Sequence, residues 1–347
     1  MLKKIEFNIG EKHIGDGHPS YIIAEIGSNH NQDYQLALKM IDTAAEAGVD
    51  AVKFQTFRAK DHYSKHAPGF SYLENTSTYE LIESLELNRD WQSSLADHAK
   101  SRGVEFLTSA CDTEAITELT KLGMVAYKVA SFDLPDHRLI NAISSTGKPL
   151  ILSTGMADMV DLSNAVNTAR KAGNEQIVLL QCTSLYPAPA ELSNLSSMQT
   201  MRQSFGCLTG YSDHTSGVHV AIASVAMGAC MIEKHFTLDR TLPGPDHPFA
   251  IEPKELEQMV KHIREVEKSI GDGLKNGPRP EEQEMFEKGR RSIHAAVDIK
   301  AGEIITEDML IIKRPGYGLV PSMWDQIVGR KAAKDIEADY WVTWDMV

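Results

Sequence analysis

Short runs rich in β-branched and aromatic residues recur along most of the chain, separated by amphipathic stretches. The stretch 36–48 places apolar residues at a helical period and ends at a glycine, as helices often do. The chain contains eight such runs, and eight parallel strands that alternate with helices can close into a barrel. The pattern therefore predicts a (β/α)8 TIM barrel. An open doubly wound sheet is the alternative, although no GxGxxG motif follows the first run. The predicted strands are 21–26, 51–57, 104–109, 126–130, 150–153, 177–182, 208–212 and 231–236.

The pattern changes after the predicted barrel. Residues 271–280 are rich in glycine and proline, and a charged stretch follows them up to residue 291. Beyond it, short strand-like runs alternate with turns, in a segment too small to bury a large core alone. We therefore predict a barrel domain over residues 1–270, a linker over 271–290 and a small, mostly β domain over 291–347.

Composition narrows the class of protein. The formal net charge of -13 disfavours nonspecific binding of nucleic acid, which requires a basic face. No apolar run reaches the roughly 18 residues of a membrane helix, and the amino terminus lacks the apolar core of an export signal, so we expect a cytoplasmic protein. The four cysteines, Cys111, Cys182, Cys207 and Cys230, have no paired spacing, which argues against a disulfide framework and a thiolate zinc cluster.

Polar residues gather where the predicted strands end. In a TIM barrel these carboxyl ends converge on one cavity, so the strand ends are candidate site positions. Lys53 and Gln55 share one parity along their strand, and so do Glu233 and His235, which suits a common cavity. The candidates are Glu25, Asn29, Lys53, Gln55, Ser109, Lys128, Ser131, Asp133, Ser153, Ser184, Tyr186, Ser212, His214, Glu233 and His235.

Two histidines at successive strand ends predict a divalent-metal site. His214 and His235 are 21 residues apart in the chain, too far to share a helix face. The predicted helix between them, residues 218–228, would bring both strands together at one edge of the sheet. Polar neighbours at Asp213 and Lys234 favour a functional site, whereas capping or structural roles are the alternative for the two imidazoles.

Lysines and hydroxyls at the same edge predict an anionic substrate. Lys53 and Lys128 supply positive charge, and serine hydroxyls donate hydrogen bonds to phosphate or carboxylate oxygens. One alternative is that either lysine only pairs with a carboxylate such as Glu25. Another is a Schiff-base aldolase, in which a lysine attacks a carbonyl and no metal is needed. The histidines beside Glu233 argue against that aldolase.

Ordered motifs across nearly the whole chain resemble the sialic acid (N-acetylneuraminate) synthases. The end of the chain, with Lys300-Ala-Gly302 and Lys313-Arg-Pro-Gly316, is similar to the antifreeze-like (SAF) domain that follows the barrel in these enzymes. The barrel motifs are Ala24-Glu-Ile-Gly-Ser-Asn-His30, Val52-Lys-Phe-Gln-Thr56, Ile151-Leu-Ser-Thr-Gly155, Gln181-Cys-Thr-Ser-Leu-Tyr-Pro187, Tyr211-Ser-Asp-His214, Ile232-Glu-Lys-His-Phe236 and Gly244-Pro-Asp-His247.

The resemblance implies a metal-dependent transferase that makes a nonulosonic acid. Such an enzyme condenses phosphoenolpyruvate with N-acetylmannosamine and water to give N-acetylneuraminate and phosphate. The alternatives are a legionaminic or pseudaminic acid synthase, which uses a diacetamido trideoxy hexose. From a different class, a non-catalytic carbohydrate-binding protein would use the barrel only as a scaffold.

The resemblance also assigns roles to residues. It implies Mn²⁺, with Mg²⁺ or Co²⁺ as alternatives, on His214 and His235, and a homodimer in which Arg314 of one SAF domain reaches the partner's sugar site. Glu25 is the candidate for the proton of the attacking water, from its position alone. The implied phosphoenolpyruvate contacts are Lys53, Ser109, Lys128, Ser131, Ser153, Ser184 and Ser212. The implied sugar contacts are Gln55, Asp133, Tyr186, Glu233, Asp246 and Arg314.

The chain departs from the family pattern at two places beside these contacts. Ser109-Ala-Cys111 stands where the family often has Thr-Pro-Phe, and Ser131-Phe-Asp133 stands where it often has Ser-Gly-Glu. Ser109 still supplies a hydroxyl, and Asp133 supplies a carboxylate on a shorter stem. We therefore expect the acceptor sugar to lie differently from the common one.

Overall fold

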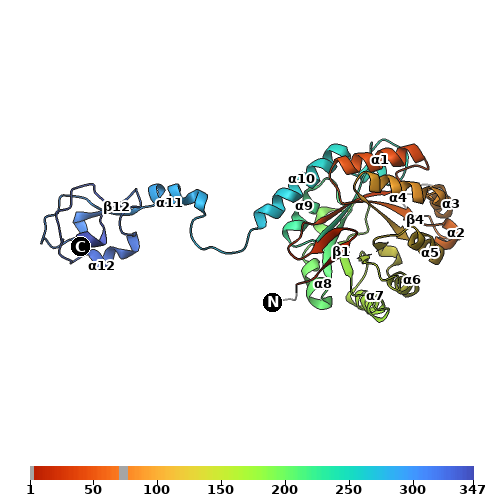
Figure 1. Cartoon of the computed structure of the whole chain (residues 1–347), viewed down its shortest axis with the longest axis horizontal. Coiled ribbons are helices and arrows are strands. Elements are labelled where there is room, and N and C mark those ends of the chain that lie inside the picture. Colours follow the sequence, from red (N-terminus) through yellow and green to blue (C-terminus); the bar gives the residue numbers. More distant parts are fainter. Residues whose placement is uncertain (1–3, 70–76) are drawn as a thin grey trace. The chain divides into compact units, whose positions relative to one another are not determined.

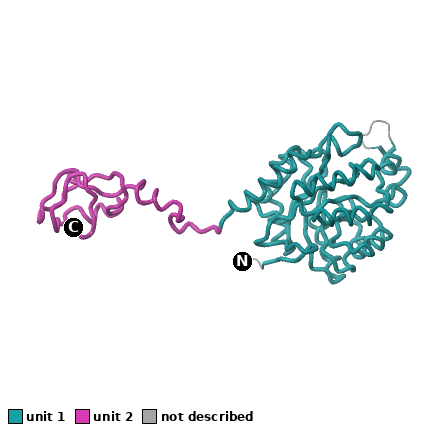
Figure 2. The backbone as a smooth tube through the Cα atoms, turned by 45° about the horizontal axis from the view of Figure 1, so that its top comes forward, with its two compact units in different colours: residues 1–271 teal, residues 272–347 magenta. Residues whose placement is uncertain are grey.

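The computed structural model describes residues 4–69 and 77–347, which form two compact units. The chain divides between Gly271 and Asp272, and the units are coloured separately in Figure 2. Each unit has its own apolar core, so each is described by itself.

Eight parallel strands close into a barrel in the first unit. Around the barrel the order is β10-β3-β4-β5-β6-β7-β8-β9, so chain neighbours are also spatial neighbours. The predicted TIM barrel is therefore confirmed over the open sheet. The strands are β3 Tyr21–Gly27, β4 Ala51–Thr56, β5 Glu105–Ala110, β6 Tyr127–Val129, β7 Leu150–Ser153, β8 Ile177–Cys182, β9 Leu208–Asp213 and β10 Met231–His235.

Helices surround the strands (Figure 1). In α1 the buried residues Ala37, Met40, Ile41 and Ala44 recur at helical spacing, and the Asp33 side chain caps the amino-terminal end. In the part of the chain that the structure describes, no helix is both long and apolar enough to cross a bilayer. The helices are α1 Tyr34–Glu46, α2 Ala59–His62, α3 Thr78–Ser84, α4 Gln92–Ser101, α5 Thr113–Lys121, α6 His137–Ser144, α7 Met159–Lys171, α8 Ser197–Phe205, α9 His219–Ala226 and α10 Pro253–Ile270.

A hairpin that the sequence pattern did not reveal precedes the barrel. Strands β1 Glu6–Ile9 and β2 Lys12–Gly15 pair antiparallel. Ile9 and Ile14 are fully buried and belong to the same apolar core as the barrel. Most residues of these two strands are exposed or only partly buried, so no continuous apolar run marks them in the sequence.

The second unit is small and has little regular structure. Strands β11 Ser292–Ala295 and β12 Leu310–Lys313 pair antiparallel, and α12 spans Trp324–Ile327. Its core includes Ile293, Ile305, Ile336 and Val342. The segment predicted as a linker contains a short helix, α11 Gln283–Gly289.

Candidate active site

A cavity of about 520 Å³ is lined by residues at the carboxyl ends of the strands. Of the predicted candidates of the first unit, all but Asn29 line this cavity; the Asn29 side chain instead donates to the Phe236 carbonyl at 3.0 Å. Arg314 belongs to the second unit, and its predicted role stays a prediction. The lining residues that had been predicted are Glu25, Lys53, Gln55, Ser109, Lys128, Ser131, Asp133, Ser153, Ser184, Tyr186, Ser212, His214, Glu233, His235 and Asp246.

Two lysines and two glutamates form a buried charge cluster at the base of this site. Lys53 Nζ lies 2.8 Å from Glu25 Oε2 and 3.7 Å from Glu233 Oε1. Lys128 Nζ lies 3.4 Å from the same Glu233 oxygen. The alternative that a lysine pairs with Glu25 therefore holds for Lys53, yet both lysines also line the cavity. Paired ammonium groups can accept an anion there without leaving an isolated buried charge.

The two glutamates of the charge cluster differ in acidity. Burial raises the pKa of Glu25 to about 7, against the attraction of the Lys53 ammonium. Burial acts on Glu233 in the same direction, but Lys128 and Lys53 outweigh it and lower the pKa of Glu233. Near neutral pH, Glu25 can therefore exchange a proton while Glu233 remains ionised.

Three serine hydroxyls and a backbone amide form what we call the hydroxyl cradle: Ser131, Ser153, Ser184 and the Gly155 N–H. The Gly155 N–H donates to Ser131 Oγ at 3.0 Å. The hydroxyls of Ser153 and Ser184 are buried and have no hydrogen-bond partner among the described residues. A Cβ added at Gly155 would lie 2.2 Å from Ser184 Oγ, so only glycine allows this close approach. Buried unpartnered donors of this kind suit an anionic ligand.

The two predicted metal-ligating histidines lie together. Their ring centroids are 5.3 Å apart. His214 Nδ1 donates to the Thr183 carbonyl at 2.8 Å, which leaves the Nε2 lone pair for a ligand. His235 Nδ1 lies 3.5 Å from Asp246 Oδ2. Burial, with repulsion from the His214 and Lys53 charges, holds the pKa of His235 well below its usual range, so this imidazole is neutral.

The unprotonated ring nitrogens of two histidines can bind a divalent metal, but they supply only part of a coordination shell. Within residues 4–69 and 77–347, His214 and His235 belong to no group of three His, Cys, Asp or Glu whose ligand atoms lie within 4.8 Å of one another. A metal on this pair would therefore keep positions open for water or substrate, as catalytic sites do.

Asp213 and Lys234, which the sequence placed among the site's polar neighbours, do not line the cavity. They form a buried ion pair of 2.8 Å, and Lys234 Nζ also donates to the Thr215 carbonyl. This pair ties the ends of β9 and β10 together beside His214 and His235.

Residues not predicted for the site form an apolar wall around the cavity. We define the apolar wall as Phe57 after β4, Leu81, Ile82 and Leu85 in and after α3, and Phe249 beside β10. These side chains follow no strand-end rule, because most come from the long connection after β4. Strand periodicity could not have found them.

Known families match both units. The sequence model of the NeuB family matches residues 40–275. The chain belongs to the NeuB family. The SAF domain matches residues 290–347, so the predicted family and terminal domain are confirmed.

Characterised relatives of this NeuB-family chain come from several branches. The N,N'-diacetyllegionaminic acid synthase of Campylobacter jejuni is 40% identical and aligns over 92% of this chain and 97% of its own. A pseudaminic acid synthase of the same species is 34% identical over 91% of this chain and 93% of its own. The solved N-acetylneuraminic acid synthetase of Leptospira borgpetersenii is 34% identical, with a TM-score of 0.74 over 82% of this chain and 96% of its own.

Proposed function

We propose that this chain is an enzyme that makes a nonulosonic acid. It condenses phosphoenolpyruvate with the open-chain form of an N-acylated mannosamine-type sugar, and water then releases phosphate. The observation that carries the proposal is one cavity that combines two buried lysines, the hydroxyl cradle and the adjacent imidazoles of His214 and His235. The names of the relatives, all nonulosonic acid synthases, support the same reaction class.

Phosphoenolpyruvate has two anionic ends, and the cavity offers two matching groups of donors. The hydroxyl cradle would take the phosphate, with Lys128 nearby in the charge cluster. The carboxylate would lie at Lys53, whose ammonium donates to Ser109 Oγ at 3.2 Å. Ser212, which donates to Glu233 Oε1 at 3.5 Å, completes the proposed phosphoenolpyruvate contacts.

The acceptor sugar would lie above the histidine pair. Tyr186 packs its ring 4.3 Å from that of His214, and Asp246 lies beside His235. Gln55 donates to Glu25 Oε1 at 2.7 Å and presents its amide to the same space. We assign sugar hydroxyl and acyl contacts to Gln55, Asp133, Tyr186, Glu233 and Asp246.

The reaction forms one carbon-carbon bond and breaks one carbon-oxygen bond. A divalent ion on His214 and His235 would supply Lewis-acid polarisation of the sugar aldehyde. The enol carbon attacks the aldehyde carbon, and the aldehyde oxygen takes up a proton to become a hydroxyl. Glu25 takes a proton from the water that adds to the former enol carbon, which balances the proton taken up by the aldehyde oxygen. The resulting intermediate passes its hydroxyl proton to the departing phosphate and leaves a ketone, while Lys128 stabilises the negative charge of that phosphate.

N-acetylmannosamine, the acceptor predicted from the sequence, stays a prediction, and two observations favour a diacetamido trideoxy hexose instead. The apolar wall suits a sugar that lacks the C6 hydroxyl and carries a second acetamido methyl, since each buried methyl group contributes about 0.8 kcal/mol. Of the three relatives described above, the legionaminic acid synthase has the highest sequence identity to this chain.

A direct assay distinguishes these acceptors. Chelator-treated protein is incubated with phosphoenolpyruvate and either acceptor, with and without Mn²⁺, while phosphate release and product mass are followed. We expect metal-dependent phosphate release with a larger kcat/KM for the diacetamido sugar. A preference for N-acetylmannosamine would return the assignment to N-acetylneuraminate. No release with either sugar would refute the proposed reaction and favour the carbohydrate-binding alternative.

Glu25→Gln is expected to change the pH dependence of turnover. Because the carboxylate must be ionised to accept a proton, kcat/KM of the wild type should fall as pH drops below about 7. The amide cannot accept that proton, so the variant should lose about 10²- to 10⁴-fold in kcat and lose this acidic limb. Steady-state assays from acidic to mildly alkaline pH test both effects. If kcat/KM of the variant still falls below about pH 7 as in the wild type, the group that titrates is not Glu25.

Gly155→Ala is expected to weaken phosphoenolpyruvate binding. The new Cβ would displace the Ser184 hydroxyl from the hydroxyl cradle, and overpacking of this kind costs about 1–3 kcal/mol. KM for phosphoenolpyruvate should therefore rise by about tenfold or more. Gly289→Ala is the matched control, because its nearest neighbour would be a Met285 atom at 3.6 Å. Equal KM values for phosphoenolpyruvate in both variants would show that the hydroxyl cradle does not bind this substrate.

We also propose a homodimer in which the SAF domain caps the partner's barrel and Arg314 contacts the partner's sugar. Arg314→Ala should then raise KM for the acceptor while leaving KM for phosphoenolpyruvate unchanged. Sedimentation should show a dimer at assay concentrations. A fully active monomer would overturn this arrangement.

A further inference from the structure

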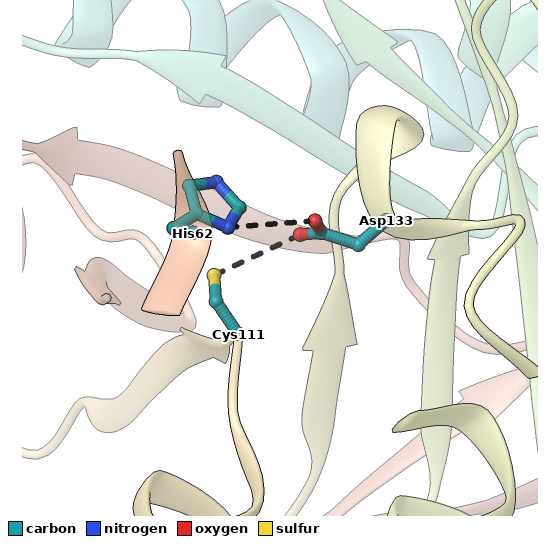
Figure 3. A group of neighbouring side chains, drawn as sticks. All are labelled: His62, Cys111 and Asp133. Atoms are coloured by element: carbon teal, nitrogen blue, oxygen red, sulfur yellow. Dashed lines mark hydrogen bonds and ion pairs between the residues drawn. The ribbon is translucent and has the colours of Figure 1, made fainter. Parts of the chain in front are cut away.

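Three side chains with metal-binding atoms converge at one side of the cavity, apart from the histidine pair (Figure 3). His62 ends α2, Cys111 follows β5, and Asp133 lies in the short 3-10 helix Ser131–Asp133. His62 Nδ1 is 3.9 Å from Asp133 Oδ1, and Cys111 Sγ is 3.7 Å from Asp133 Oδ2. No other trio of His, Cys, Asp or Glu in the described chain brings its ligand atoms within 4.8 Å of one another.

The spacing is close to what a tetrahedral ion requires. Zinc bonds of about 2.0 Å to nitrogen or oxygen and about 2.3 Å to sulfur place neighbouring ligand atoms roughly 3.3–3.6 Å apart. The Cys111–Asp133 separation of 3.7 Å is close to this range, the His62–Asp133 separation of 3.9 Å is longer, and all three ligand atoms lie within 4.8 Å of one another. Binding therefore requires side-chain rotations that draw the three atoms together. The His62 ring already stacks on Phe57, with centroids 5.9 Å apart and planes inclined by 17°.

Solvent and ligands can reach the trio. The His62 and Asp133 side chains are 22% and 14% exposed, and all three residues line the cavity. An ion can therefore enter from the cavity without opening the barrel. Three protein ligands leave a fourth tetrahedral position open.

We propose that His62, Cys111 and Asp133 form a second divalent-metal site that prefers Zn²⁺. One nitrogen, one sulfur and one carboxylate oxygen are a ligand set that suits zinc, whereas Mg²⁺ and Mn²⁺ prefer oxygen. On binding, the Cys111 S–H bond breaks, the proton passes to solvent, and a sulfur-zinc bond forms. No oxidation or reduction is involved.

The consequence for turnover rests on the proposed function, in which Asp133 contacts the acceptor. Zinc on this trio would engage the Asp133 carboxylate and occupy space beside the sugar. Zn²⁺ should therefore inhibit competitively against the acceptor and leave KM for phosphoenolpyruvate unchanged.

Cobalt provides a direct test of binding, because a thiolate ligand to Co²⁺ gives a near-ultraviolet charge-transfer band. Chelator-treated full-length protein is titrated with Co²⁺. We expect the band in the wild type, its loss in Cys111→Ser, and at least a tenfold weaker Co²⁺ affinity in His62→Gln. Cys182→Ser is the matched control, since Cys182 Sγ lies 3.7 Å from His214 Nδ1 and is the thiol beside the other histidine site. This control should keep the band.

Two outcomes would overturn the second site: no band in the wild type, or a band that survives in Cys111→Ser. Zinc inhibition of the wild type that disappears in Cys111→Ser would support the consequence for the acceptor. An intact band in a protein without synthase activity would refute the proposed function and leave the metal site standing.

Discussion

His235→Ala is expected to abolish metal-dependent turnover. The neutral imidazole of His235 is one of two proposed protein ligands, so its loss leaves His214 alone to hold the ion. Lewis-acid polarisation contributes several kcal/mol to the transition state, which corresponds to a loss of about 10³-fold or more in kcat/KM. Equilibrium dialysis with Mn²⁺ and steady-state assays of phosphate release measure the two effects together.

His219→Ala is the matched control for this experiment. His219 is exposed at the first position of α9 and does not line the cavity, so this variant should keep both metal binding and turnover. Thermal unfolding of both variants separates a local loss from misfolding. A folded His235→Ala protein with full Mn²⁺-dependent turnover would place the metal elsewhere.

Lys53→Met is expected to lower both stability and phosphoenolpyruvate affinity. Removal of the ammonium leaves Glu25 buried without its partner at 2.8 Å, and breaking a buried pair in this way costs about 3–5 kcal/mol. The proposed contact to the substrate carboxylate disappears with it, so affinity should fall by about 10²-fold, equivalent to about 2.7 kcal/mol. Denaturant unfolding and phosphoenolpyruvate titration provide the measurements.

The double variant Lys53→Met/Glu25→Gln separates the two effects. Without a charge on either residue, no unpaired carboxylate remains at position 25, so much of the stability should return. Phosphoenolpyruvate affinity should stay low, because Lys53 is still absent. Recovery of affinity along with stability would mean that Lys53 only balances Glu25, which is the structural alternative for this lysine.

The barrel strands were predictable because their signal is local. The runs 150–153 and 177–182 match β7 and β8 residue for residue, since a buried parallel strand is a short apolar stretch whatever its neighbours are. The hairpin of β1 and β2 was missed because most of its residues are exposed or only partly buried, so it has no continuous apolar run such as those of β7 and β8. Its burial depends on the barrel core that it covers.

The residues of the site were predictable for the same reason, but their interactions were not. Strand ends converge in any TIM barrel, which placed Lys53, Glu233 and His235 on the cavity wall before any distance was known. Strand alternation already points Lys234 away from the side that Glu233 and His235 share, but its pairing with Asp213 follows only from the alignment of β9 and β10.

The sequence by itself determined the eight strands, the family and the set of polar residues that meet at one end of the barrel. Only the tertiary structure decided that Lys53 bridges Glu25 and Glu233, that the connection after β4 supplies the apolar wall, and that His62, Cys111 and Asp133 come together. The physical reason is the distance along the chain between the residues that interact. Strand and helix periods depend on residues a few positions apart, whereas these contacts join residues 22 to 180 positions apart, and only barrel closure and strand register fix their distances.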